Sequence, residues 1–254
     1  YQYEWKEAVL PATGSFFAFN DGFFPGGDFI QSTGTFSQFG TDVSQLTGIA
    51  ADTLEAVGIA AFNPRFFQAP RTRGSQARDS GQFGLSIGTI LPQYNDTKVS
   101  LYFANYHATL PGYGLRTPGL EAYQQYSQQG IEGLTQALVE AGADPALAPE
   151  AATLTQSDRF IEGLQYFSQY REDIRMLGLS FNTTATTTGL SYYGEIAHTR
   201  SAPINVHSGD LLNLILPGAS RENPFPPVDL SEISQEELEA NYANKRVDGV
   251  IERD

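Results

Sequence analysis

Five short segments of the chain alternate between apolar and polar residues, and their connections are alternately short and long. The segments are residues 1–6, 82–91, 99–108, 173–182 and 190–199. An alternation with a period of two predicts β-strands that have one apolar and one polar face. Residues 92–98 and 183–189 are short connections, whereas residues 7–81, 109–172 and 200–254 are long ones. Short turns at one rim and long loops at the other are typical of a bacterial transmembrane β-barrel.

We therefore expect an all-β fold, an antiparallel up-and-down transmembrane β-barrel whose long loops carry short helices. Helical spacing of apolar residues predicts helices within residues 42–61 and 120–141. The acidic stretch 231–242 is a third helix candidate, with Ser231 as a possible N-cap. The chain begins with Tyr1 inside a predicted strand and ends at Asp254 in an acidic, irregular segment. We interpret it as an internal fragment of one barrel domain. The smallest barrels have about eight strands, so we expect flanking sequence to supply the others.

The composition excludes several classes of protein. The chain has 25 Gly, 17 Phe and 13 Tyr but only 17% charged residues, which favours β-structure with many turns. No apolar run approaches the ~18 residues of a transmembrane helix. The absence of Cys excludes disulfides, thiolate nucleophiles and Cys-based zinc sites. The net charge of −14 argues against nucleic acid as a partner and against a basic surface that binds membranes.

The parity of residues within each segment predicts which side chains would face lipid and which would line the interior. The predicted membrane-facing side chains are Tyr3, Trp5, Leu85, Ile87, Leu101, Phe103, Leu177, Leu179, Tyr192 and Ile196. The predicted lumen or substrate-path side chains are Ser86, Tyr102, Arg175, Tyr193 and Glu195.

Glu195 is the sharpest single candidate among the predicted lumen residues. A carboxylate toward lipid is costly, whereas inside a barrel it would meet water, Arg175 or a loop that plugs the lumen. An ordinary interior ion pair is the alternative interpretation of this residue.

Residues 84–88 match the G-x-S-x-G pattern of a hydrolase nucleophile elbow, with Ser86 as the nucleophile. The elbow requires a strand-to-helix turn, whereas these residues lie inside an alternating segment, so small inward-facing residues are the preferred interpretation. His107, His198 and His207 are the only histidines, and none lies at ligand spacing from another His or a close carboxylate. We predict no catalytic residue, no metal site and no cofactor.

The first long connection contains two further patterns. Residues 20–22 with Asp28 offer oxygen atoms to calcium, but they lack the alternating acidic loop of a calcium site, so a solvated turn is preferred. Residues 16–29 are rich in Phe. This cluster could plug the barrel or cap it as an entry site, and packing within a long loop is the simpler interpretation.

Four stretches together carry a family resemblance. They are residues 1–5 (YQYEW), 78–84 (RDSGQFG), 170–181 (YREDIRMLGLSF) and 194–198 (GEIAH), the last leading into Ser201-Ala202-Pro203. With these stretches in this order, the chain resembles the proteobacterial envelope family catalogued as domain of unknown function 1302. The resemblance covers the predicted strands and their flanks, and the long loops match only loosely.

The resemblance implies a longer protein that is similar to outer-membrane β-barrels. It also implies genomic neighbours for lipid or hydrophobic-compound handling and large efflux-type transporters. It therefore implies movement of apolar molecules across the outer membrane, and it carries over no catalytic or binding residue.

We expect a non-catalytic channel or transporter component for hydrophobic small molecules or lipids in the bacterial outer membrane. The expected partners are outer-membrane lipid, an apolar small-molecule ligand and periplasmic or efflux-type transport proteins, but not nucleic acid. Two alternatives remain: a surface binding or adhesion module that displays long acidic loops, and a barrel-embedded serine hydrolase that uses Ser86.

Overall fold

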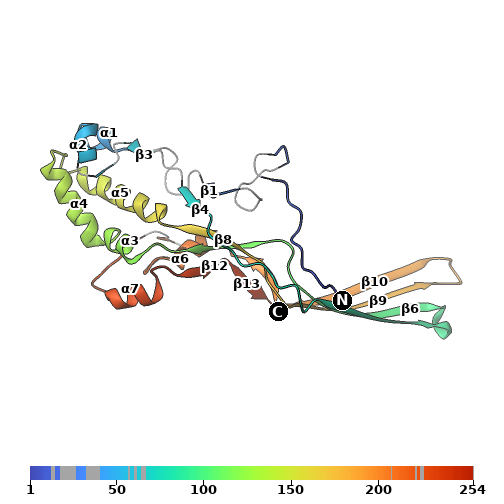
Figure 1. The fold of residues 1–254 in the computed structure, drawn as a ribbon. Helices are drawn as coiled ribbons and strands as arrows, with labels where there is room; N and C mark the ends of the chain where they lie inside the picture. The colour runs from blue at the N-terminus through green and yellow to red at the C-terminus, as the bar shows by residue number, and fades with distance from the viewer. Residues whose placement is uncertain are drawn as a thin grey trace.

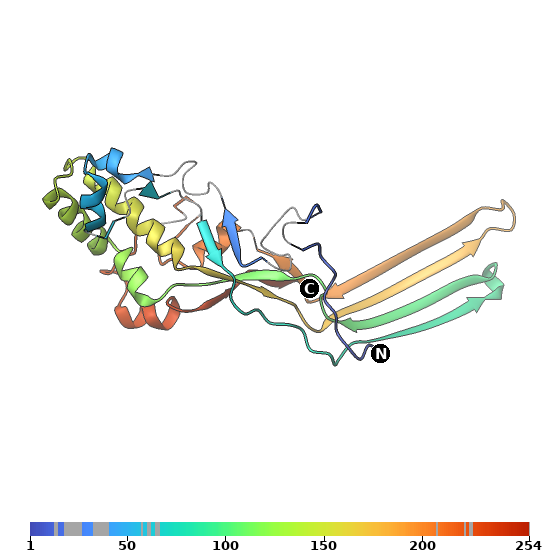
Figure 2. The ribbon, with the colours of Figure 1, turned by 45° about the horizontal axis from the view of Figure 1, so that its top comes forward.

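Two parts of different shape make up the protein (Figures 1 and 2). The computed structural model describes residues 1–12, 15–17, 27–32, 41–56, 58–59, 62–63, 67–206, 208–220, 222–223 and 226–253. Four long strands extend to one side as a ribbon, which we call the long sheet. Helices and shorter strands form a packed body on the other side, which we call the head.

The long sheet consists of two hairpins that lie side by side. Its strands are β5 (Phe83–Leu91), β6 (Thr97–Tyr106), β9 (Ile174–Thr184) and β10 (Ser191–Arg200), in the order β10-β9-β6-β5. All three pairings are antiparallel. The prediction of an antiparallel, sheet-rich fold with these two hairpins is therefore confirmed.

The hairpin turns lie at the end of the long sheet that is remote from the head (Figure 2). The first turn contains η1 (Pro92–Tyr94) followed by Asn95 and Asp96, whose φ angles are 56° and 53°. Asn and Asp tolerate this left-handed backbone better than most residues, which explains why the chain can reverse here. In the second turn Gly189 has a φ of 69°.

The predicted strand over residues 1–6 is not formed. Gln2 makes one antiparallel bridge with Gln82, and the chain then leaves the edge of the sheet. Trp5 explains the departure, because its ring is buried at the base of the sheet and packs edge-on against Tyr170, with ring centroids 4.7 Å apart. The indole N–H of Trp5 donates to the carbonyl oxygen of Ala108 at 3.1 Å. Trp5 therefore does not share the exposed apolar face that the sequence predicts for it.

The long sheet is open in the part of the chain that the structure describes. It has four strands rather than the five predicted, and β5 and β10 form its two edges. No helix among the described residues is long and apolar enough to cross a membrane.

The three long connections fold together as the head. Its helices are α1 (Val43–Thr47), α2 (Ala51–Ala56), α3 (Leu120–Gln125), α4 (Gln128–Glu140), α5 (Ala148–Glu162), α6 (Ser208–Asn213) and α7 (Gln235–Asn241). Its strands are β1 (Phe29–Ser32), β2 (Thr41–Asp42), β3 (Phe62–Asn63), β4 (Phe67–Pro70), β7 (Gly112–Arg116), β8 (Gln165–Gln169), β11 (Ala202–Asn205), β12 (Arg246–Asp248) and β13 (Val250–Arg253). The helices predicted within residues 42–61, 120–141 and 231–242 are present.

A hydrophobic core holds the head together. Tyr123 of α3, Leu138 of α4 and Phe160 of α5 are fully buried and belong to one cluster. The ring of Tyr123 meets that of Phe160 edge-on, with centroids 4.9 Å apart. These connections are therefore a folded body, whereas the sequence predicts loops with short helices.

Candidate functional site

The cross-strand register of the long sheet brings the predicted membrane-facing residues onto one face. Residues that lie directly opposite in an antiparallel sheet share a face, so each row can be read across the four strands. Two central rows are Leu85, Phe103, Leu177 and His198, and then Ile87, Leu101, Leu179 and Ile196. Tyr192 lies on the same face, opposite Thr183 near the turns. We call this side of the long sheet the apolar face.

The opposite side carries small and polar side chains, and we call it the polar face. Its rows are Ser86, Tyr102, Gly178 and Ala197, then Gly88, Ser100, Ser180 and Glu195, then Ile90, Lys98, Asn182 and Tyr193. The hydroxyl of Tyr102 lies 2.9 Å from Oγ of Ser180. Ser86, Tyr102, Tyr193 and Glu195 therefore share one face, as their sequence pattern predicts.

Solvent reaches both faces of the ribbon in this chain. On the apolar face, Leu85 is 60% exposed, Ile87 63% and Ile196 71%. On the polar face, Tyr193 is 82% exposed. No described element of the head packs over the outer part of the ribbon (Figures 1 and 2). A row of apolar side chains this exposed indicates an interaction surface that contacts protein, lipid or an apolar ligand.

Arg175 does not lie on the polar face, in contrast to its prediction. Its cross-strand partners are Asn105 and Arg200, in the row at the head end of the apolar face. Glu195 lies opposite Ser180, on the polar face and further along β9. Adjacent positions of a strand point to opposite faces, so of the three neighbours considered for Glu195 (water, Arg175 or a plugging loop) Arg175 lies on the other face of the sheet.

The motif at residues 84–88 also lacks the geometry of a nucleophile elbow. Ser86 lies in the middle of β5 opposite Tyr102, and the strand continues to Leu91. The strand-to-helix turn that lifts a nucleophile out of its sheet is therefore absent at Ser86.

Tyr3 is 82% exposed, but it lies outside the long sheet. His198 is exposed at the head end of the apolar face. His207 and residues 20–22 lie outside the described residues, as does most of the Phe-rich segment 16–29. Of that segment, Phe16 and Phe17 are described, and their exposed rings contact each other edge-on.

No group of three or more His, Asp or Glu side chains with metal-site geometry occurs in the described ranges.

A charged network joins the base of the long sheet to the head. Arg78 donates from Nη1 to Oε2 of Glu172 at 2.7 Å and from Nη2 to Oδ2 of Asp173 at 2.6 Å. Asp173 also accepts a hydrogen bond from the amide of Asn105 at 3.0 Å. The Asn105 amide, and after it the Arg78 guanidinium, hold the pKa of Asp173 below its usual range.

His107 adds a second connection at the same place, and it is 1% exposed. Its Nδ1 accepts a hydrogen bond from the backbone N–H of Asp173 at 3.0 Å, so Nε2 carries the proton and donates to the carbonyl oxygen of Ser80 at 2.9 Å. Both ring nitrogens are engaged by the backbone, which gives His107 a structural role at the start of β9.

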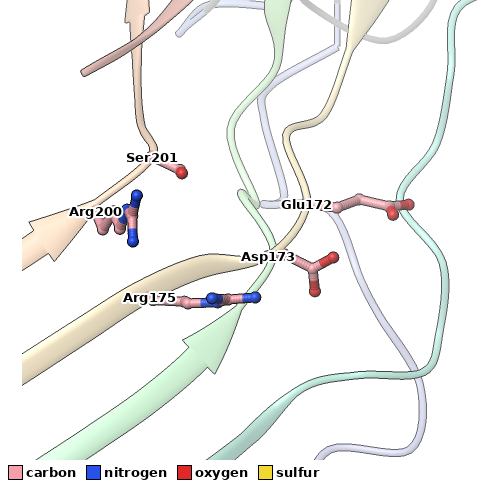
Figure 3. Close-up of a pocket in the computed structure, with 5 residues that line it drawn as sticks. All are labelled: Glu172, Asp173, Arg175, Arg200 and Ser201. Atoms are coloured by element: carbon pink, nitrogen blue, oxygen red, sulfur yellow. The ribbon is translucent and has the colours of Figure 1, made fainter. Parts of the chain in front are cut away.

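A pocket of about 410 Å³ opens beside this network at the base of the long sheet (Figure 3). Glu172, Asp173, Arg175, Arg200 and Ser201 line it. The sequence pattern singles out only Arg175 among these residues, and for a different role. The signal that could have found the others is the run of charged residues at the head-side ends of β9 and β10.

A comparison with models of protein families gives a match over nearly the whole chain. The model of the family described as "Protein of unknown function (DUF1302)" matches residues 1–249. No curated protein and no solved structure matches the chain.

Proposed function

For this chain, which belongs to the DUF1302 family, we propose that the long sheet forms part of an outer-membrane β-barrel. In this proposal the barrel is a non-catalytic channel or transporter component for hydrophobic small molecules or lipids. The observation that carries it is the division of the long sheet into an exposed apolar face and a polar face. Lipid would solvate the apolar face, and water in the lumen would solvate the polar face.

The dimensions of the long sheet support this proposal. β9 has 11 residues. At about 3.4 Å per residue, it is about 34 Å long, and a tilt of ~40° reduces the height that it spans to about 26 Å. The apolar band of an outer-membrane barrel is about 25 Å tall, so β9 has the length that a spanning strand needs.

The free edges of the long sheet also favour a larger assembly of strands. β5 and β10 each leave a row of backbone N–H and C=O groups without a strand partner in the described chain. In lipid such groups must be paired, and in water they invite aggregation. The bridge between Gln2 and Gln82 lies on the outer edge of β5 and is antiparallel, so that edge can accept another antiparallel strand. We propose that further strands close the barrel.

The polar face has the properties of a lumen wall in this proposal. Ser86, Gly88 and Ser100 are small and leave space, while the hydroxyl of Tyr102 bonds Ser180. Glu195 supplies a carboxylate in mid-strand, where a water-filled interior would solvate it. Passage of a solute would then depend on the shape and lining of the lumen and requires no catalytic group.

A pair of substitutions on β10 tests the lipid-facing assignment. Ile196→Lys introduces a charge in the middle of the apolar face, where burial in lipid would cost about 2–4 kcal/mol. Ala197→Lys introduces the same charge at the next position on the polar face. The readout is the gel mobility of outer-membrane protein from cells that express the full gene product, with and without boiling.

We expect a heat-dependent shift for the wild type and for Ala197→Lys, with a large loss of the shifted form for Ile196→Lys. A soluble wild-type protein without a shift would contradict the barrel. The surface-binding module would then become the leading interpretation.

Transport requires a separate experiment. Deletion of the gene should change the uptake or export of at least one apolar compound, and expression of the wild type should restore it. If the carboxylate of Glu195 lines the transport path, expression of Glu195→Gln should restore the uptake or export of that compound to a different extent than the wild type does. Normal handling of a broad panel of apolar compounds in the deletion strain would contradict the transport role while leaving the barrel intact.

A further inference from the structure

We propose that Lys98 and Glu195 together bind the zwitterionic headgroup of an amphiphile that passes along the polar face. The inference rests on the proposed function in one respect, the enclosure of the polar face within a lumen. It deepens that function, because it names the class of lipid or apolar molecule that the path accepts. The observation that carries it is the placement of two opposite charges on either side of a hydroxyl network.

The polar face carries one charge of each sign along the four strands of the long sheet. Lys98 of β6 and Glu195 of β10 both lie on it, and both are exposed in this chain. The other Lys, Arg, Asp or Glu residues of these strands are Arg175 and Arg200, which lie on the apolar face. The polar face of the described strands therefore has no net charge.

The cross-strand register keeps the two charges apart. Lys98 lies opposite Asn182 of β9, which in turn lies opposite Tyr193 of β10. Glu195 follows Tyr193 by two positions on the same strand. Two strand spacings of about 4.8 Å and two residues of about 3.4 Å place the Cα atoms of Lys98 and Glu195 about 12 Å apart. No ion pair joins either side chain to another residue in the described ranges.

A hydroxyl network lies between the two charges. The phenol oxygen of Tyr102 is 2.9 Å from Oγ of Ser180, which is the residue opposite Glu195. The charges of Lys98 and Glu195 both act on this phenol, and they do so with opposite signs. This part of the wall thus offers a cation at one end, an anion at the other and hydrogen-bonding groups in the middle.

A dipolar group without net charge matches this arrangement. Its positive end can bind the carboxylate of Glu195 while its negative end binds the ammonium group of Lys98. A singly charged solute is attracted by one residue and repelled by the other, and a hydrocarbon gains from neither. Both attractions are stronger in a narrow lumen than in bulk water, because the effective dielectric constant is lower there.

The neighbouring rows on the head side favour an amphiphile over a small hydrophilic zwitterion. The first of these rows contains Tyr102 and Ala197, and the second contains Ala104 and Met176. An alkyl chain can contact these side chains while its headgroup lies between the two charges.

The test uses the full gene product in a non-ionic detergent and native mass spectrometry. The probe is dodecylphosphocholine, while dodecyl sulfate and dodecyltrimethylammonium carry the same chain with a single charge. Glycerophosphocholine supplies the headgroup without the chain. Lys98→Gln and Glu195→Gln each remove one charge from the polar face. Lys245→Gln and Glu132→Gln remove the same charges from the head as matched controls, and circular dichroism verifies that each variant is folded.

We expect the wild type to bind dodecylphosphocholine more tightly than either charged probe. Each polar-face variant should weaken that binding by about tenfold, because it removes one charge-assisted contact. The preference should also change: Lys98→Gln leaves the anion and should favour dodecyltrimethylammonium, whereas Glu195→Gln leaves the cation and should favour dodecyl sulfate. The two controls should bind like the wild type. Unchanged affinity and preference in either polar-face variant would overturn the site.

Glycerophosphocholine that binds as tightly as dodecylphosphocholine would overturn the assignment to an amphiphile, because the chain would then contribute nothing. The proposed function fails in a different way. A protein that is absent from the outer membrane but still binds dodecylphosphocholine through these two residues would refute the barrel and leave the site standing.

Discussion

Trp5 shows how one side chain can determine the path of a whole segment. Residues 1–6 alternate like a strand, yet Trp5 is 8% exposed and lies in the junction between the long sheet and the head. Its backbone N–H donates to Asp79 at 3.0 Å, and its indole N–H donates to Ala108. These bonds, together with the contact with Tyr170, stabilise the departure of the chain from the edge of β5.

We expect Trp5→Phe to lower the free energy of unfolding by about 1–2 kcal/mol, because the phenyl ring keeps part of the packing but cannot donate to Ala108. Urea unfolding in detergent, followed by circular dichroism, measures the loss. Circular dichroism is needed because Trp5 is the single Trp of the chain. Tyr3→Phe, at an exposed side chain, serves as the control and should change the free energy by less than about 0.5 kcal/mol. Equal effects of the two substitutions would contradict the role of Trp5.

Asp173 makes the stability of the junction depend on pH. Because the folded-state pKa of its carboxyl is lowered, the ionised form contributes stability above the unfolded-state value of 3.8. That contribution is lost as the pH falls through the lower folded-state pKa. We expect Asp173→Asn to cost about 1 kcal/mol at pH 7, since the carboxylate is partly exposed to solvent.

The difference between wild type and Asp173→Asn should shrink as the pH is lowered below 3.8. Unfolding midpoints measured in detergent between pH 7 and pH 3 give this profile. In an Arg78→Gln background the effect of Asp173→Asn at pH 7 should be smaller. A difference that stays constant over the whole range would show that the charge of Asp173 contributes nothing.

At the scale of elements, two glycines of the head differ in the space that surrounds them. Gly74 lies where residues 67–81 run beside β8, and a Cβ atom added to it would lie 2.0 Å from the carbonyl oxygen of Ser168. Gly133 lies within α4, and a Cβ atom there would meet nothing within 4 Å. The first glycine permits a close approach of two backbones, whereas the second costs helix stability without a packing reason.

We therefore expect Gly74→Ala to destabilise the protein by about 1–3 kcal/mol, because the segment must move away from β8. Gly133→Ala should stabilise it by about 0.5–1 kcal/mol through a lower conformational entropy of the unfolded chain. Urea unfolding of both variants under one set of conditions tests the contrast. The same sign of change in both variants would contradict the packing of residues 67–81 against β8.

At the scale of the whole molecule, the head and the hairpin turns lie at opposite ends (Figure 1). In an outer-membrane barrel, short turns face the periplasm and longer connections face the exterior. The proposed function thus predicts that the head lies outside the cell and that the turns lie on the periplasmic side of the outer membrane. The chain has no Cys, so single cysteines can report each end without background from these 254 residues, and the gene product without the added Cys serves as the blank.

We expect Glu132→Cys, on α4 in the head, to react in intact cells with a maleimide too large to cross the outer membrane. Thr187→Cys, in the second turn, should react only after the outer membrane is permeabilised. Gel mobility of the labelled protein measures both reactions. The opposite pattern would reverse the proposed orientation, and labelling of both sites in intact cells would contradict a membrane-spanning sheet.

The local pattern of the chain determined the two hairpins and the faces of their strands. Alternation with a period of two is a property of neighbouring residues, so it identified β5, β6, β9 and β10 and grouped Leu85 with Ile87 and Ser86 with Tyr102. Helical periodicity likewise indicated α3 and α4, and the acidic stretch 231–242 indicated α7. The sequence pattern did not predict α5, whose Ala-rich face is buried where α5 packs against α4, α3, α1 and β4.

Tertiary structure alone decided the rest. The exact register of β9 against β10 depends on the conformation of the turn, and it places Arg175 opposite Arg200 and Glu195 opposite Ser180. Several contacts join residues that are distant in sequence. They are the packing of Trp5, the ion pairs of Arg78 with Glu172 and Asp173, and the hydrogen bonds of the His107 ring to the backbone of Ser80 and Asp173. Periodicity within one segment cannot report such contacts, because they form only when the head packs against the base of the long sheet.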